Sequence, residues 1–347
     1  MGIQKLAPQA GDTPYSEIPT PGEVMEVAPG VLWLRLPLPF LLNHVNVYLI
    51  EDGDGWAMLD TGIGDEKTRQ IWRAAFAGPL KGFRLNRLIL THHHPDHMGM
   101  AGWISRRLDI PVHMTLTEFL MGKFLGSGEV ATRGDFYATF YRRHGISEGL
   151  IVNLIQRGHR YLETITPLPD TFLTLTHGAP LVLGGRSFQV LTGGGHSSDQ
   201  AMLWSPEEKI FFAADQIIEH ISPNVSVHAM EPEANPLGQF IASLTELANT
   251  IPPDTLTLPG HRLPFREAGR RARELVGHHD QRCDRLAEMV EAGALTIAEI
   301  APRLFERKLD EHQMTFALSE TLAHANHMVA QGRLRWTGKD VLYLARA

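Results

Sequence analysis

A dense group of metal-ligating side chains directly after an apolar run constrains this sequence more than any other feature. Residues 87–90 have the short apolar pattern of a buried β-strand. The chain then runs straight into His92, His94, Asp96 and His97. Imidazole and carboxylate groups suit borderline divalent cations such as zinc. Because a loop that leaves a strand end can turn alternate side chains inward, these four residues predict a metal site with room for two metal positions.

Strand-like runs alternate with turn signals and helical stretches through the first two thirds of the chain, which favours an α/β layered fold. Residues 115–170 interrupt this order, because they are largely helical and rich in aromatic side chains. An insertion beside a strand-end site is where a lid is expected. The predicted strands are 31–36, 45–50, 56–59, 87–90, 111–114, 181–183, 188–191, 201–204, 210–213 and 256–258, and the predicted helices among them are 67–77, 101–107 and 236–249.

The last 82 residues have a different, helical character. Helices are predicted over residues 270–291 and 314–329. A further helix is expected to begin at Thr296, because Thr296 and Glu299 have the spacing of a capping box. A hairpin is expected around residues 337–340, and helices followed by a hairpin indicate a small winged-helix-like domain. The chain is therefore divided into an extended lead-in (1–22), a catalytic domain (23–265) and a C-terminal domain (266–347).

Composition narrows the class of protein further. The chain has 347 residues, of which 43% are hydrophobic and 20% charged, as in ordinary soluble globular proteins. The net charge of the chain is −7, whereas a dedicated nucleic-acid binder is expected to carry an excess of lysine and arginine. Cys283 is the only cysteine, which excludes an internal disulfide and a cysteine-based zinc site. No apolar run is long enough to span a bilayer and no secretory signal is seen, which predicts a cytoplasmic protein without a membrane partner.

The motifs together resemble those of the metallo-β-lactamase superfamily. Thr91–His97 matches the family pattern T-H-x-H-x-D-H, and Leu59–Gly62 matches an early L-D-T-G. A Gly-rich turn ends at His196, a strand ends at Asp215, and Gly260-His261 follows a late strand. The resemblance implies a four-layer αββα sandwich carrying the helical insertion and the C-terminal domain. This sequence departs from many relatives in having G-G-G-H-S at the third motif and Arg262 after the last histidine.

The resemblance also implies a role for each motif residue. It implies two divalent cations, with zinc as the first expectation and iron or manganese as alternatives. Asp96 and Asp215 would be the catalytic residues, and Asp60 would hold the ligand loops through hydrogen bonds. His220 and His228, in the loop after Asp215, are candidates for substrate contact. The implied ligands are His92, His94 and His196 for the first metal, Asp96, His97 and His261 for the second, and Asp215 for both.

These residues predict a dinuclear hydrolase in which a metal-bridging hydroxide attacks a carboxylic ester, lactone or thioester. True metallo-β-lactamases generally lack a bridging aspartate at the position of Asp215, whereas glyoxalase II-like thioesterases and lactonases have it. The acidic catalytic portion and the aromatic insertion favour a small-molecule, acyl-bearing substrate.

Two other functions stay open at this point. The first is a metal-dependent endoribonuclease or phosphodiesterase, which the winged-helix-like segment supports and the near-neutral charge of that segment opposes. The second is a non-catalytic binding protein of the same fold, which is disfavoured because competent residues occupy all seven ligand positions. A homodimer through the insertion or the tail also stays open.

Overall fold

Two β-sheets form the centre of the computed structural model, which describes residues 4–5, 15, 17–129, 133–305 and 311–347. Within these residues the first sheet has eight strands in the order β1 to β8, and the second has five in the order β13-β12-β11-β10-β9. The first sheet comprises β1 (Gln4–Lys5), β2 (Met25–Ala28), β3 (Val31–Pro37), β4 (His44–Asp52), β5 (Gly55–Leu59), β6 (Leu85–Ile89), β7 (Val112–Met114) and β8 (Leu173–Thr174). The second comprises β9 (Pro180–Leu183), β10 (Arg186–Gly193), β11 (Gln200–Ser205), β12 (Ile210–Ala214) and β13 (Leu256–Pro259).

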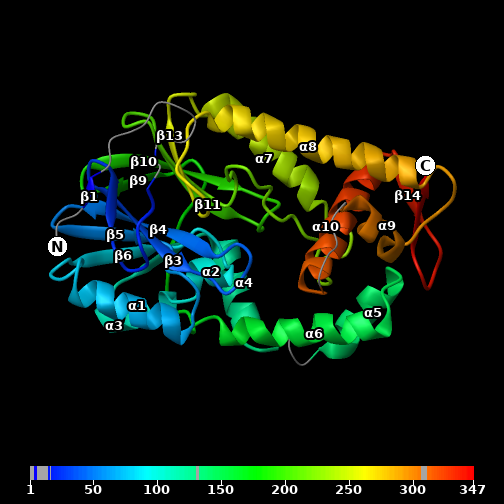
Figure 1. Ribbon diagram of the computed structural model, residues 1–347, viewed down its shortest axis with the longest axis horizontal. Helices are drawn as coiled ribbons and strands as arrows, with labels where there is room; N and C mark the ends of the chain where they lie inside the picture. Colours follow the sequence, from blue (N-terminus) through cyan, green and yellow to red (C-terminus); the bar gives the residue numbers. More distant parts are fainter. Residues whose placement is uncertain (1–3, 6–14, 16, 130–132, 306–310) are drawn as a thin grey trace.

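The two sheets pack face to face with helices on both outer faces. Between the sheets lies an apolar layer in which Phe212 contacts Tyr48 and Phe188, with ring centroids 5.4 and 6.0 Å apart. Helices α1 (Glu66–Ala77) and α3 (Ala101–Leu108) cover the first sheet, and α7 (Pro236–Thr250) and α8 (Ala268–Met289) cover the second (Figure 1). The expected four-layer αββα sandwich is therefore confirmed.

The insertion and the C-terminal helices share one core. Ala138 and Ile151 of the insertion belong to the same buried cluster as Leu318 of α10 and Phe240 of α7. The C-terminal elements therefore pack against the sandwich and the insertion, and the domain boundaries stay a prediction. The elements concerned are α4 (Leu116–Gly126), α5 (Gly134–Arg143), α6 (Glu148–Glu163), α9 (Ile297–Leu304), α10 (Glu311–Ala330), β14 (Leu334–Thr337) and β15 (Tyr343–Arg346).

Local sequence signals account for several of these elements. The predicted capping box is present, because the Thr296 side chain accepts from the Glu299 backbone and the Glu299 carboxylate accepts from the Thr296 N–H. The expected terminal hairpin is the antiparallel pair β14–β15. Strands β2 and β8 were not predicted, since runs this short carry little periodic signal. Within the described residues, no helix is both long and apolar enough to cross a membrane.

The lead-in is more tightly attached than its composition suggests. Most of residues 1–22 lie outside the described part of the chain. Of the remainder, β1 pairs in parallel with β2, and Tyr15 is buried and donates its hydroxyl to the Val27 carbonyl. Strand β1 therefore adds to the edge of the first sheet, and the extended lead-in over 1–22 stays a prediction.

A buried histidine pair joins α8 and α10 to the loop that follows β12. His279 Nδ1 lies 3.1 Å from His324 Nε2, and His324 Nδ1 donates to the Glu320 carbonyl at 2.7 Å. Ser222 Oγ lies 3.2 Å from His279 Nε2. Burial, together with neighbouring histidines and Arg282, lowers the pKa of His279 to about 2 and that of His324 to about 3. Both rings are therefore neutral in the folded chain.

This pair predicts loss of stability in mild acid. Above pH 6.5 both histidines are neutral whether the chain is folded or unfolded. Below pH 6.5 both histidines become protonated in the unfolded chain but stay neutral in the folded chain. The free energy of unfolding therefore falls by about 1.4 kcal/mol per pH unit for each histidine. Urea unfolding between pH 7 and 4 should show a shallower loss in the double variant His279→Leu/His324→Leu. The exposed His220→Leu serves as control, and equal pH slopes in all three proteins would refute the assignment.

Candidate metal centre

The predicted site residues follow strand ends that meet at one edge of the sandwich. Strands β5 and β6 are parallel, as are β12 and β13. Strand β10 runs in the direction of β12, because each is antiparallel to β11. The two sheets are tied together at this edge by the Ala201 N–H, which donates to the Thr91 carbonyl at 2.8 Å. The residues that leave these carboxyl ends are Asp60 after β5, His92 and His94 after β6, His196 after β10, Asp215 after β12 and His261 after β13.

The structure brings the seven predicted ligands together, six of them in two groups of three and the seventh, Asp215, between the groups. Helix α2 (Pro95–Met98) begins with a proline and carries Asp96 and His97 in one turn. Within each group the ligand atoms lie within 4.8 Å of one another. The first group is His92, His94 and His196, and the second is Asp96, His97 and His261.

Asp215 stands between the two groups. Its Oδ2 lies 3.4 Å from His196 Nε2 of the first group and 3.1 Å from His261 Nε2 of the second. It also lies 3.4 Å from His97 Nε2. One carboxylate oxygen therefore faces both groups, as a bridging ligand must.

Hydrogen bonds from the outer ring nitrogens aim the inner ones at the centre. His97 Nδ1 donates to Asp60 Oδ2 at 2.8 Å, and His196 Nδ1 donates to the Asn224 carbonyl at 2.8 Å. His261 Nδ1 donates to the His44 carbonyl at 2.7 Å. Each bond leaves Nε2 with a free lone pair, which is the arrangement that ligating histidines adopt.

The donor set fits divalent cations. Among the described residues, His97 Nε2, His196 Nε2 and Asp215 Oδ1 are buried without a hydrogen-bond partner, and unpaired buried polar atoms are costly unless something binds them. His92 Nε2 and His94 Nδ1 face each other at 2.9 Å. A Cβ at Gly260 would come within 2.2 Å of Asp215 Oδ1, so only glycine leaves that carboxylate its place. The fold and these groups together imply bound divalent metal ions.

The charges of the site are strongly coupled. Burial opposes the charged form of Asp215, but His261 and His97 outweigh it and hold its pKa well below the ordinary value. Burial likewise opposes protonation of His261, yet Asp215 and Asp96 raise its pKa to about 9. Burial and the neighbouring histidines lower the pKa of His92 and His94 well below the usual range. The carboxylates of the site are therefore ionised and His92 and His94 are neutral, whereas His261 holds a proton that a bound cation would displace.

Asp60 holds both ends of the loop after β6, which carries four of the predicted ligands. Its Oδ1 accepts the Thr91 N–H and its Oδ2 accepts the Thr91 hydroxyl, both at 2.9 Å, besides the bond from His97. It has a left-handed backbone with φ of 61° directly after β5, which turns its side chain toward the next strand end.

Replacement Asp60→Ala should weaken metal binding by about 10- to 100-fold, the usual effect of losing an orienting partner. The reason is that His97 loses the acceptor that fixes its ring. Competition with a chromophoric chelator measures the affinity, and Asp54→Ala, whose side chain is 75% exposed, is the control. An unchanged affinity in Asp60→Ala would show that the ligand loop does not need this support.

Glu118 is a site residue that the sequence did not reveal. It is fully buried on α4, where its Oε2 accepts the His93 N–H at 3.0 Å and the His93 ring nitrogen Nδ1 at 2.5 Å. Its Oε1 accepts the Asp199 N–H at 2.7 Å. The first contact holds the loop of His92 and His94, and the second holds the loop of His196. Burial opposes its charge, but His93 outweighs burial and lowers the pKa of Glu118.

The local sequence around Glu118 indicates a different role. Thr115 and Glu118 have the spacing of a capping box, yet the Thr115 side chain makes no capping bond and donates instead to the Asp199 carbonyl at 2.8 Å. Both residues therefore anchor the His196 loop. From the lid side, the Tyr161 hydroxyl of α6 donates to the His93 carbonyl at 2.8 Å. No pattern along the chain could connect these segments.

The two candidate contact histidines lie outside the ligand groups of the described residues. The His220 side chain is 80% exposed and its Nε2 lies 3.2 Å from Glu219 Oε1. His228 is exposed to solvent, and desolvation together with His93 lowers its pKa to about 4. A substrate contact for either residue stays a prediction.

Comparison with known proteins gives two family matches. The metallo-beta-lactamase superfamily matches residues 42–261, a segment that contains all seven ligands. The metallo-beta-lactamase-like, C-terminal domain matches residues 283–343. The second match covers the end of α8, then α9, α10 and β14, while the winged-helix comparison stays a prediction.

Individual relatives resemble the whole chain or part of it. A beta-lactamase domain protein from Burkholderia ambifaria is 36% identical, with a TM-score of 0.90 over 97% of this chain and 98% of its own. The probable metallo-hydrolase YqjP of Bacillus subtilis is 23% identical over 90% of this chain and 97% of its own length. The acyl-coenzyme A thioesterase MBLAC2 of Bos taurus is 24% identical over 55% of this chain and 64% of its own length.

Proposed function

Because the chain belongs to the metallo-beta-lactamase superfamily, we propose that this metallo-hydrolase is a dinuclear enzyme that cleaves carboxylic thioesters and the related esters or lactones. The single observation that carries the proposal is Asp215, whose Oδ2 faces both ligand groups at 3.1 and 3.4 Å. A carboxylate between the two ligand groups would allow two cations to share one ligand and act together on a substrate. Zinc suits the donor set best, with iron and manganese as alternatives.

The residues of the chain prepare the site for hydrolysis. Cations held there would lower the pKa of bound water toward neutrality and polarise a substrate carbonyl. Hydrogen bonds from Nδ1 of His97, His196 and His261 fix these rings with Nε2 turned toward the site. Asp96 and Asp215 add negative charge on the inner side of the site. Glu118 and Asp60 keep the ligand loops in place while substrate enters.

Two observations support an acyl substrate. One relative, MBLAC2, is named an acyl-coenzyme A thioesterase. The chain has a net charge of −7, whereas phosphodiester binding draws on clustered lysine and arginine. The acyl group at which a thioester is cleaved is uncharged and does not need such a cluster.

The test is a substrate panel on one metal-loaded preparation. Purified chain is loaded with Zn²⁺, Fe²⁺ or Mn²⁺, its metal content is measured, and it is assayed against acetyl and decanoyl thioesters, a lactone, an aryl ester, bis(p-nitrophenyl) phosphate and single-stranded RNA. We expect about two ions per chain and turnover of the acyl substrates. Cleavage confined to the phosphodiester or RNA would replace the proposal with the nuclease alternative. Firm metal binding without any turnover would favour a binding protein.

A further inference from the structure

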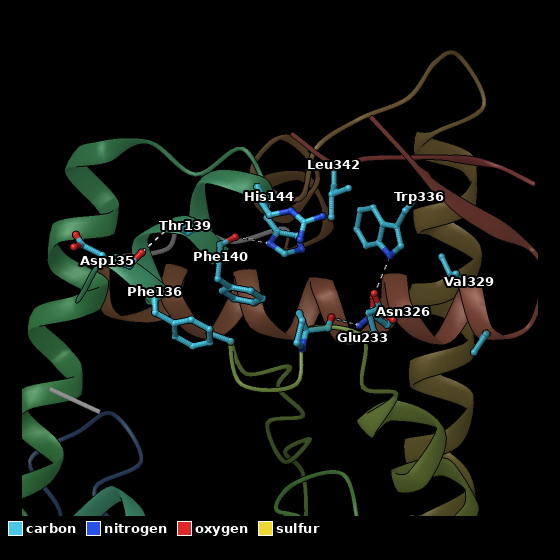
Figure 2. Close-up of a pocket in the computed structure, with 14 residues that line it drawn as sticks. Asp135, Phe136, Thr139, Phe140, His144, Glu233, Asn326, Val329, Trp336 and Leu342 are labelled. Carbon is cyan, nitrogen blue, oxygen red and sulfur yellow. Dashed lines mark hydrogen bonds between the residues drawn. The ribbon is translucent and has the colours of Figure 1, made fainter. Parts of the chain in front are cut away.

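A cavity of about 730 Å³ lies beyond the metal centre, between α5, the loop after His228, α10 and the terminal hairpin (Figure 2). We name it the aromatic pocket. Its volume is in the range that takes a small organic ligand. None of the seven predicted ligands lines it. Its apolar wall consists of Phe136, Phe140, Ala229, Val329, Ala330 and Trp336.

The polar atoms in the wall are already used by the protein. Trp336 Nε1 donates to Asn326 Oδ1 at 3.2 Å, and Asn326 Nδ2 donates to the Pro232 and Ala234 carbonyls, both at 2.9 Å. His144 Nδ1 donates to the Phe140 carbonyl at 2.8 Å (Figure 2). No residue lining the pocket has a buried side-chain polar atom left without a partner in the described chain. The buried part of the wall therefore offers a ligand mainly apolar contact.

The charges that line the pocket disfavour an anion. Asp135 and Glu233 contribute carboxylates, and Arg143 is the one lysine or arginine among the lining residues. A nucleotide or another multiply charged phosphate group would meet more negative than positive charge here. Phe136 and Phe140 point from α5 toward the space beside Glu233 and Asn326 (Figure 2). The pocket thus suits an uncharged apolar group.

One loop joins the pocket to the metal centre. The Asn224 carbonyl of this loop accepts a hydrogen bond from Nδ1 of the predicted ligand His196 at 2.8 Å. Further along the same loop, Ala229 lines the pocket, and Pro232 and Glu233 follow it along the same wall. The loop therefore leads from the metal centre to the pocket.

We propose that the aromatic pocket binds the uncharged acyl tail of the substrate, so that the enzyme selects long or aryl acyl groups. This inference rests on the proposed function for its substrate, but the pocket's affinity for an apolar group does not depend on catalysis. Ala330 is exposed at the last position of α10 and lines the pocket. Ala330→Trp therefore fills the pocket from its rim without crowding the core. Ala77→Trp, an exposed alanine at the last position of α1, is the matched control.

Direct binding is measured with the neutral fluorescent probe N-phenyl-1-naphthylamine on the full metal-loaded chain. We expect the probe to bind, to be displaced by a decanoyl thioether that cannot be hydrolysed, and to bind roughly tenfold more weakly to Ala330→Trp. Ala77→Trp should bind it as the parent does. Equal affinity in Ala330→Trp, confirmed as folded by its melting temperature, or no binding at all, would overturn the inference.

Kinetics separate this inference from the proposed function. The ratio of kcat/KM for decanoyl over acetyl thioester should fall roughly tenfold in Ala330→Trp and stay unchanged in Ala77→Trp. If no acyl substrate is hydrolysed but the probe still binds to the parent and not to Ala330→Trp, the proposed function fails while the apolar pocket stands. If thioesters are hydrolysed and neither the ratio nor probe binding responds to Ala330→Trp, the pocket assignment fails alone.

Discussion

Asp215→Ala is expected to lower kcat/KM by roughly 10³-fold or more, because metal-assisted charge stabilisation is worth several kcal/mol. Asp215 Oδ2 is the atom that faces both ligand groups. Its loss also leaves His97 and His261 without the carboxylate that balances them. Metal content should therefore fall together with activity. Both are measured on the same preparation, by elemental analysis and by thioester hydrolysis.

The control for this variant is Asp254→Ala, which removes an exposed carboxylate of the same length. It should keep the parent's metal content and rate. Asp215→Asn preserves the shape of the side chain but removes its charge, so it tests whether charge or packing matters. An Asp215→Ala protein that retained full metal content and full activity would show that the two groups do not act as one centre.

Glu118→Ala is expected to lower the free energy of unfolding by about 3–5 kcal/mol, because each buried donor left without its acceptor costs about 1–3 kcal/mol. The substitution leaves the His93 and Asp199 N–H groups and the His93 ring without their acceptor. Because it releases both loops of the first ligand group, it should also weaken metal binding there by about 10- to 100-fold. Urea unfolding of the metal-free chain and chelator competition measure the two effects.

Glu163→Ala is the matched control, since Glu163 is exposed at the end of α6. Glu118→Gln keeps one acceptor oxygen and should recover part of the stability. A purely structural role would change unfolding alone, whereas a positioning role also lowers metal affinity. Parent-like metal affinity in a folded Glu118→Ala protein would refute the positioning role.

The clustering of the predicted ligands could be foreseen because each follows a strand end that the sequence marks. His92, His94, Asp96 and His97 share six consecutive residues, and His196, Asp215 and His261 each end a short buried run. Parallel strands place their carboxyl ends at the same edge of a sheet. Residues that follow such strands in the sequence therefore lie close together in the fold. The layered fold was predictable on the same ground.

The supporting contacts could not be predicted, because they join segments far apart in the chain. Glu118 has the spacing of a helix cap, yet its partners are His93 and Asp199. The aromatic pocket gathers Phe140, Ala229 and Trp336 from the insertion, a loop and the terminal hairpin. Neither arrangement leaves a periodic signal.

The sequence by itself determined which chemistry this protein can hold, since the identity and order of the ligands fix a site of imidazoles and carboxylates. The tertiary structure alone decided how that site is supported and what lies beside it. The physical reason is that ligand type is a property of single side chains, whereas support and pocket shape arise from packing between elements that have no fixed spacing in the chain.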